Sequence, residues 1–127
     1  MSEMDEYQRA VQIWSVLILA ARTQEILSYE MVGQLTGLAP VGLGRTLGNV
    51  AAYCVAHKLP ALTALVVKKE TGVPAVELPG AKIPDIHAEQ ARVFVYDWLS
   101  HGAPKVEDFR VARGKVFGSE TVKAATT

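Results

Sequence analysis

Hydrophobic and polar positions alternate at helical spacing near the start of the chain, between Met4 and Thr23. Steps of four and three residues place one apolar stripe on a helix, made of Tyr7, Val11, Trp14, Ile18 and Ala21. A second apolar stripe consists of Ala10, Ile13, Leu17 and Ala20. Because the two stripes leave little of the helix after Trp14 to face water, we expect burial on more than one side. The helix is either the spine of the domain core or part of a dimer interface.

Two further helices joined by a tight turn are predicted between Ser28 and His57. The hydroxyl of Ser28 can accept a free backbone N–H at a helix start, and Gly37 suits the left-handed position that ends a helix. Pro40 then fits the first turn of the next helix, where no N–H is needed. The apolar positions of that second helix continue to about His57, and they are Val41, Leu43, Leu47, Val50, Ala51 and Val55.

A β-hairpin is predicted after the second of these helices. Residues 62–69 are rich in β-forming side chains, and the Glu-Thr-Gly sequence at 70–72 is typical of a hairpin turn into a second strand at 73–78. Helix, turn, helix and hairpin in this order predict a mostly α-helical protein with a small β-hairpin. This is the winged helix-turn-helix fold, which presents one helix and one hairpin on the same side of a small core.

The remaining segments are predicted to add packing helices at the N-terminal and C-terminal ends of this fold. Asp85 can cap a helix that runs to Ser100, in which Phe94 and Trp98 share one face. We therefore place a winged-helix domain at residues 1–102. Residues 103–127 mix charged and apolar side chains, and we expect a partly disordered C-terminal extension with a short element.

Composition limits what the protein can bind. The 127 residues are 50% hydrophobic and 20% charged, which is typical of a folded globular protein. Thirteen basic and thirteen acidic residues cancel, so nucleic-acid binding would need a local basic patch. The single Cys54 cannot form an internal disulfide. The N-terminus is acidic, whereas an export signal begins with basic residues. No apolar run is long enough to span a membrane. We expect a cytoplasmic protein.

Tyr29, Gly37, Arg45 and Gly48, followed by the segment LTALVV, resemble the C-terminal DNA-binding domain of one enzyme family. These are the alkylguanine DNA alkyltransferases, together with their catalytically inactive alkyltransferase-like relatives. In that family a tyrosine opens the first motif helix, a glycine ends it, and an arginine followed by a glycine lies in the second helix. The resemblance covers the middle third of the chain. It implies that Tyr29 lies near a DNA phosphate and that Arg45 inserts into a duplex.

The catalytic strand of that family is not matched. Where the family has Pro-Cys-His-Arg before its paired valines, this chain has Leu62-Thr63-Ala64-Leu65. Thr63 therefore stands at the position of the nucleophile, and a neutral threonine hydroxyl without a neighbouring base is a poor acceptor for an alkyl group. The three histidines have no metal-ligand spacing with one another or with Cys54. We expect a protein that is not an enzyme and uses no metal or cofactor.

Two functions remain open. The first is a non-catalytic DNA-binding protein with five contact residues at the groove and the phosphates, which are Arg45, Thr46, Asn49, Lys68 and Lys69. The second is a protein interaction module, such as a regulator or small inhibitor of a larger assembly, including one used in phage and host conflict. The second helix of the pair is rich in glycine and carries one charge on its exposed face, which suits close packing. A homodimer through the N-terminal helix would strengthen a weak DNA binder.

Overall fold

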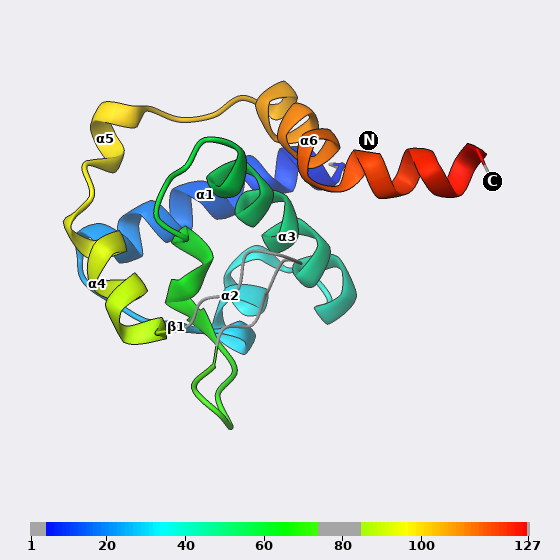
Figure 1. Ribbon diagram of the computed structural model, residues 1–127. Helices are drawn as coiled ribbons and strands as arrows, with labels where there is room; N and C mark the ends of the chain where they lie inside the picture. Colours follow the sequence, from blue (N-terminus) through cyan, green and yellow to red (C-terminus); the bar gives the residue numbers. More distant parts are fainter. Residues whose placement is uncertain (1–4, 74–84, 127) are drawn as a thin grey trace.

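Helices make up most of the part of the chain that the computed structural model describes, residues 5–73 and 85–126 (Figure 1). Helices α1 (Glu6–Arg22) and α3 (Pro40–Ala56) form the centre, and α6 (Val106–Thr126) packs against both. The smaller elements are β1 (Leu27–Ser28), α2 (Tyr29–Thr36), the 3-10 helix η1 (Leu62–Leu65), β2 (Val66–Val67), α4 (Ile86–Val95) and α5 (Trp98–His101). The prediction of a mostly helical protein is confirmed. None of the helices in the described ranges is both long and apolar enough to cross a membrane.

The first three helices lie where their capping residues predict them. The Asp5 carboxylate accepts backbone N–H groups at the start of α1. The Ser28 hydroxyl accepts the N–H of Met31 at 3.0 Å and so caps α2. Gly37 ends α2 with a φ of 72°, a left-handed conformation that glycine adopts without steric cost. Pro40 begins α3. The predicted pair of helices joined by a tight turn is confirmed.

The strand predicted over residues 62–69 is wrong in its first half, where the chain forms η1 instead. Two side chains of α4 hydrogen-bond the backbone of this segment in place of a neighbouring strand. The Glu89 carboxylate accepts the N–H of Ala61 at 2.7 Å, and the Gln90 amide donates to the carbonyl of Ala64 at 3.0 Å. All four residues of η1 are buried, so its polar backbone groups need partners from within the protein.

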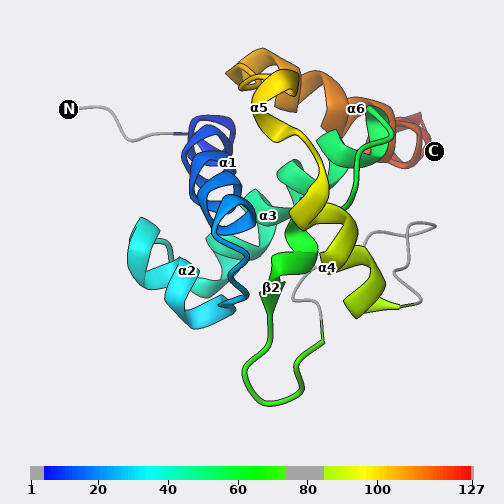
Figure 2. The ribbon, with the colours of Figure 1, turned by 90° about the vertical axis from the view of Figure 1, so that its left-hand side faces the viewer.

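The short strand that does form pairs with a different segment from the one predicted. β2 lies parallel to β1, with Leu27 opposite Val66, so the sheet is not an antiparallel hairpin. The turn predicted at 70–72 is present, because the N–H of Lys68 donates to the carbonyl of Val73 at 2.9 Å. The turn protrudes from the end of the molecule opposite α6 (Figures 1 and 2). The second predicted strand lies outside the described residues after Val73.

The helix predicted from Asp85 to Ser100 is divided into α4 and α5. Asp85 caps α4 as expected. The division has a local cause, because the Asp97 carboxylate accepts the N–H of Ser100 at 3.2 Å and so starts a new helix. The Trp98 indole N–H donates to the carbonyl of Val93 at 2.8 Å and ties the two helices together.

The C-terminal segment is a long helix in place of the expected short element. Within α6, Phe109 is 0% exposed and Ala112 is 1% exposed. The centre of the Phe109 ring lies 6.0 Å from the centre of the Trp14 ring, and Trp14 also packs edge-on against Tyr53 and Trp98. Side chains from α1, α3, α5 and α6 therefore meet in one aromatic cluster. The core extends beyond residue 102, where the sequence pattern places the domain boundary.

Cys54 belongs to the core, as its position among apolar neighbours predicts. Its side chain is 2% exposed, and burial raises the pKa of the thiol to about 12. Because the thiolate is the reactive form, we expect a disulfide reagent to modify Cys54 only after unfolding. Absorbance of the released thiol, followed with and without denaturant, measures this. A native-state rate equal to that of the unfolded chain would contradict the burial.

Candidate functional site

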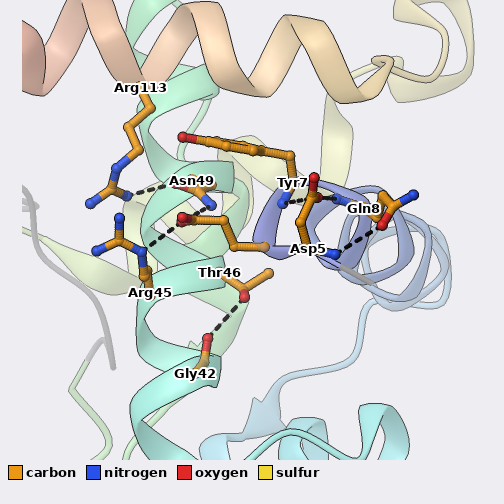
Figure 3. A network of polar contacts seen from close by, with 9 residues as sticks. Asp5, Tyr7, Gln8, Gly42, Arg45, Thr46, Asn49 and Arg113 are labelled. Atoms are coloured by element: carbon orange, nitrogen blue, oxygen red, sulfur yellow. Dashed lines mark hydrogen bonds and ion pairs between the residues drawn. The ribbon is translucent and has the colours of Figure 1, made fainter. Parts of the chain in front are cut away.

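A network of polar side chains joins the start of α1, the residues Arg45 and Asn49 of α3, and Arg113 of α6. Glu6 Oε2 accepts hydrogen bonds from Arg45 Nε at 2.8 Å and from Asn49 Nδ2 at 2.9 Å. Asn49 Oδ1 accepts from Arg113 Nη1 at 2.6 Å. Figure 3 shows Arg45 and Arg113 pointing to the same side of α3, with Asn49 between them. One carboxylate and one amide thus hold two guanidinium groups from different helices.

Asn49 is the centre of this network. It is 0% exposed, and its amide oxygen and nitrogen are both occupied by neighbouring side chains. Thr46 is 2% exposed, and its hydroxyl donates to the carbonyl of Gly42 at 2.8 Å. The prediction that these two residues contact a groove is therefore wrong. Their face of α3 is covered by the surrounding helices, so neither polar group can reach a base.

Arg45 and Arg113 differ in how far they are exposed. The Arg45 side chain is 56% exposed and lies in an ion pair with Glu6 through Nε, so much of its guanidinium group faces solvent. Arg113 is half-buried, and its guanidinium carbon lies 4.7 Å from the centre of the Phe117 ring. Stacking on an aromatic ring favours a fixed orientation of a guanidinium group. Glu6 and Arg113 were not identified from the sequence, because they lie far from Arg45 along the chain.

The Glu6 carboxylate is held in its charged form. Burial by itself would raise the pKa of Glu6, but hydrogen bonds from Asn49 and Arg45 and the charges of Arg45 and Arg113 outweigh it. The pKa of Glu6 is therefore lowered from its usual value of 4.5. At neutral pH the network holds two positive charges and one negative charge.

The lowered pKa predicts how stability depends on pH. A carboxyl group with a lower pKa in the folded state contributes stability above its unfolded-state pKa, near 4.5, and loses it as the pH falls through the folded value. We expect Glu6→Gln to lower the free energy of unfolding at pH 7, and the difference from the parent protein to shrink below pH 4.5. Urea unfolding across this range is the measurement. Glu25→Gln, at an exposed position, is the control. If the difference in unfolding free energy between Glu6→Gln and the parent protein does not vary with pH, the lowered pKa of Glu6 is contradicted.

Tyr29 supports the start of α3. Its hydroxyl donates to the carbonyl of Pro40. A Cβ atom at Gly44 would lie 3.2 Å from that hydroxyl, which explains a glycine inside this helix. The side chain is half-buried, and burial raises the pKa of Tyr29 despite a backbone hydrogen bond from Gly44, which lowers it.

The remaining predicted contact residues lie elsewhere on the molecule. Lys68 and Lys69 are exposed on the protruding turn. Among the contacts of the described residues, none joins these lysines to Arg45 or Arg113. Thr63, at the position of the family's nucleophile, is 2% exposed within η1.

Comparison with known proteins adds no relative. No protein-family model, curated protein or solved structure matches this sequence.

A second feature is an apolar recess between α2 and the start of α3. It has a volume of about 570 Å³, and the residues that line it are Tyr29, Glu30, Gly33, Gln34, Gly37, Leu38, Ala39, Pro40 and Leu43. Leu35 and Val41, which are sequence neighbours of lining residues, are 62% and 88% exposed. This surface has no basic side chain in its lining.

Proposed function

We propose that the protein is a non-catalytic DNA-binding module that contacts backbone phosphates with Arg45 and Arg113. One observation supports this above all, the placement of two guanidinium groups on the same side of α3. A guanidinium group presents several N–H donors in a planar fork that matches the oxygens of a phosphate. Contacts to phosphates provide much of the affinity of proteins for DNA.

The other residues of the network have supporting roles in this proposal. The Glu6 carboxylate accepts a hydrogen bond from Arg45 Nε, and the Asn49 amide oxygen accepts one from Arg113 Nη1. Both bonds orient a guanidinium group in advance, which reduces the entropy lost on binding. Lys68 and Lys69 on the protruding turn would provide a second point of contact with the backbone.

The proposed fold assignment is the winged helix-turn-helix, with α2 and α3 as the helix pair and the turn at 68–73 as the wing. The resemblance to the alkyltransferase-like proteins, carried by Tyr29, Gly37, Arg45 and Gly48, agrees with a role on DNA. Burial of both Thr63 and Cys54 supports a function without nucleophilic chemistry.

Fluorescence anisotropy of a labelled random duplex at low salt tests this proposal. We expect the parent protein to bind and Arg45→Ala to bind more weakly. Arg92→Ala is the matched control, because Arg92 is also exposed and also pairs with a glutamate, on α4. Absence of binding by the parent protein would reject the DNA proposal. Equal losses for Arg45→Ala and Arg92→Ala would reject the assigned site.

A protein interaction module is the second candidate, and the recess between α2 and α3 favours it. Its largely apolar lining, which includes Glu30, suits an apolar segment of a partner protein that carries a basic residue. Under this alternative the parent protein does not bind duplex DNA. The exposed Val41 would be a main contact, and Val41→Asp would abolish capture of the partner.

A further inference from the structure

A second apolar surface lies between α1 and α5. It contains a recess of about 330 Å³, lined by Trp14, Ser15, Ile18, Trp98, Leu99, Gly102 and Ala103. The two tryptophans are 3% and 2% exposed and lie in the interior behind it. The small residues Gly102 and Ala103 line the recess without long side chains to fill it.

Large apolar side chains protrude beside this recess. Leu99 lines it and is nevertheless 62% exposed. Leu19 is 66% exposed and lies one helical turn after Ser15, on the same stripe of α1. A recess and protruding leucines therefore occur on one face. Exposed apolar groups gathered in this way are typical of a surface that binds a partner.

The charges at the edge of this face are of both signs. Arg22 ends α1, and Asp97 caps the start of α5. The pKa of Asp97 is lowered, mainly by the hydrogen bonds that Asp97 accepts from Ser100 and also by the charge of Arg22, which lies nearby. In a two-fold dimer, Arg22 of one copy can face Asp97 of the second copy, and Asp97 of the first copy then faces Arg22 of the second. A face with both a cation and an anion at its edge can thus match itself.

We propose that this face binds a second copy of the same chain. In the resulting two-fold dimer, Leu19 and Leu99 of each copy pack against the recess of the other. Arg22 of one copy pairs with Asp97 of its partner at the edge. The formal net charge of zero means that two copies do not repel each other over long distances. This contact is separate from the proposed DNA site and does not depend on it.

Sedimentation across a dilution series, without DNA, tests the apolar part of the interface. We expect the parent protein to be dimeric at high concentration, and Leu19→Glu and Leu99→Glu to be monomeric. Leu35→Glu is the matched control, since Leu35 has the same 62% exposure as Leu99 but lies on α2, and it should leave the dimer intact. Circular dichroism confirms that each variant is folded. A parent protein that stays monomeric, or a dimer lost only in Leu35→Glu, would overturn the proposal.

Charge exchange provides a second test that a folding defect cannot imitate. Arg22→Glu and Asp97→Arg each place like charges opposite one another in a homodimer, so each variant alone should dissociate more readily. An equimolar mixture of the two variants restores opposite charges at both edges of a heterodimer. We expect the mixture to dimerise more tightly than either variant alone. A mixture no tighter than the separate variants would overturn the proposed pairing.

Discussion

Phe109→Ala is expected to lower the free energy of unfolding by about 3–5 kcal/mol, the usual loss for a large aromatic side chain in a core. Phe109 is fully buried, and the centre of its ring lies 6.0 Å from the centre of the Trp14 ring and 5.3 Å from that of the Tyr53 ring. Its removal would leave a cavity where α6 meets α1 and α3. The effect should be large although the residue lies in a segment that the sequence marks only as an extension.

Urea unfolding followed by tryptophan fluorescence measures this loss. Val111→Ala is the matched control, because Val111 is on the same helix but 47% exposed, and a change within about 0.5 kcal/mol is expected. A loss below about 1 kcal/mol for Phe109→Ala would mean that α6 is not part of the core.

The fold was most predictable where a local signal and an apolar pattern agree. Ser28, Gly37 and Pro40 mark the ends of α2 and α3 correctly, because capping depends on residues a few positions apart. The segment 62–65 was assigned wrongly, since its β-forming residues do not reveal that side chains of α4 would hydrogen-bond its backbone. Such contacts between distant segments override local propensity.

The candidate site was predictable only in part. Arg45 was identified correctly as an exposed residue of α3. Thr46 and Asn49 follow it closely in the sequence, and their burial depends on how α1 and α6 pack around the helix. Polar side chains at such positions are typical of a contact surface, but here both find their partners inside the protein. Thr46 donates to the carbonyl of Gly42, and Asn49 bonds Glu6 and Arg113. Arg113 had no local signal that connected it with Arg45.

Asn49→Ala is the second prediction with a large effect. It would leave the partially buried Glu6 and Arg113 without their shared amide, and a loss of about 1–3 kcal/mol in unfolding free energy is expected. We also expect weaker DNA binding, because Arg113 would lose the bond that orients it. Urea unfolding and anisotropy measure the two effects. Gln34→Ala, at an exposed amide on α2, is the control for stability. An Asn49→Ala protein as stable as its parent would show that the network is not formed.

The salt dependence of duplex binding tests the proposed phosphate site most directly. Each phosphate contact contributes about 0.9 to the slope of the logarithm of the binding constant against the logarithm of the salt concentration. We predict that Arg45→Ala and Arg113→Ala each reduce the magnitude of this slope by about 1, and that Arg92→Ala leaves it unchanged. Slopes equal to that of the parent protein in both Arg45→Ala and Arg113→Ala would contradict the account.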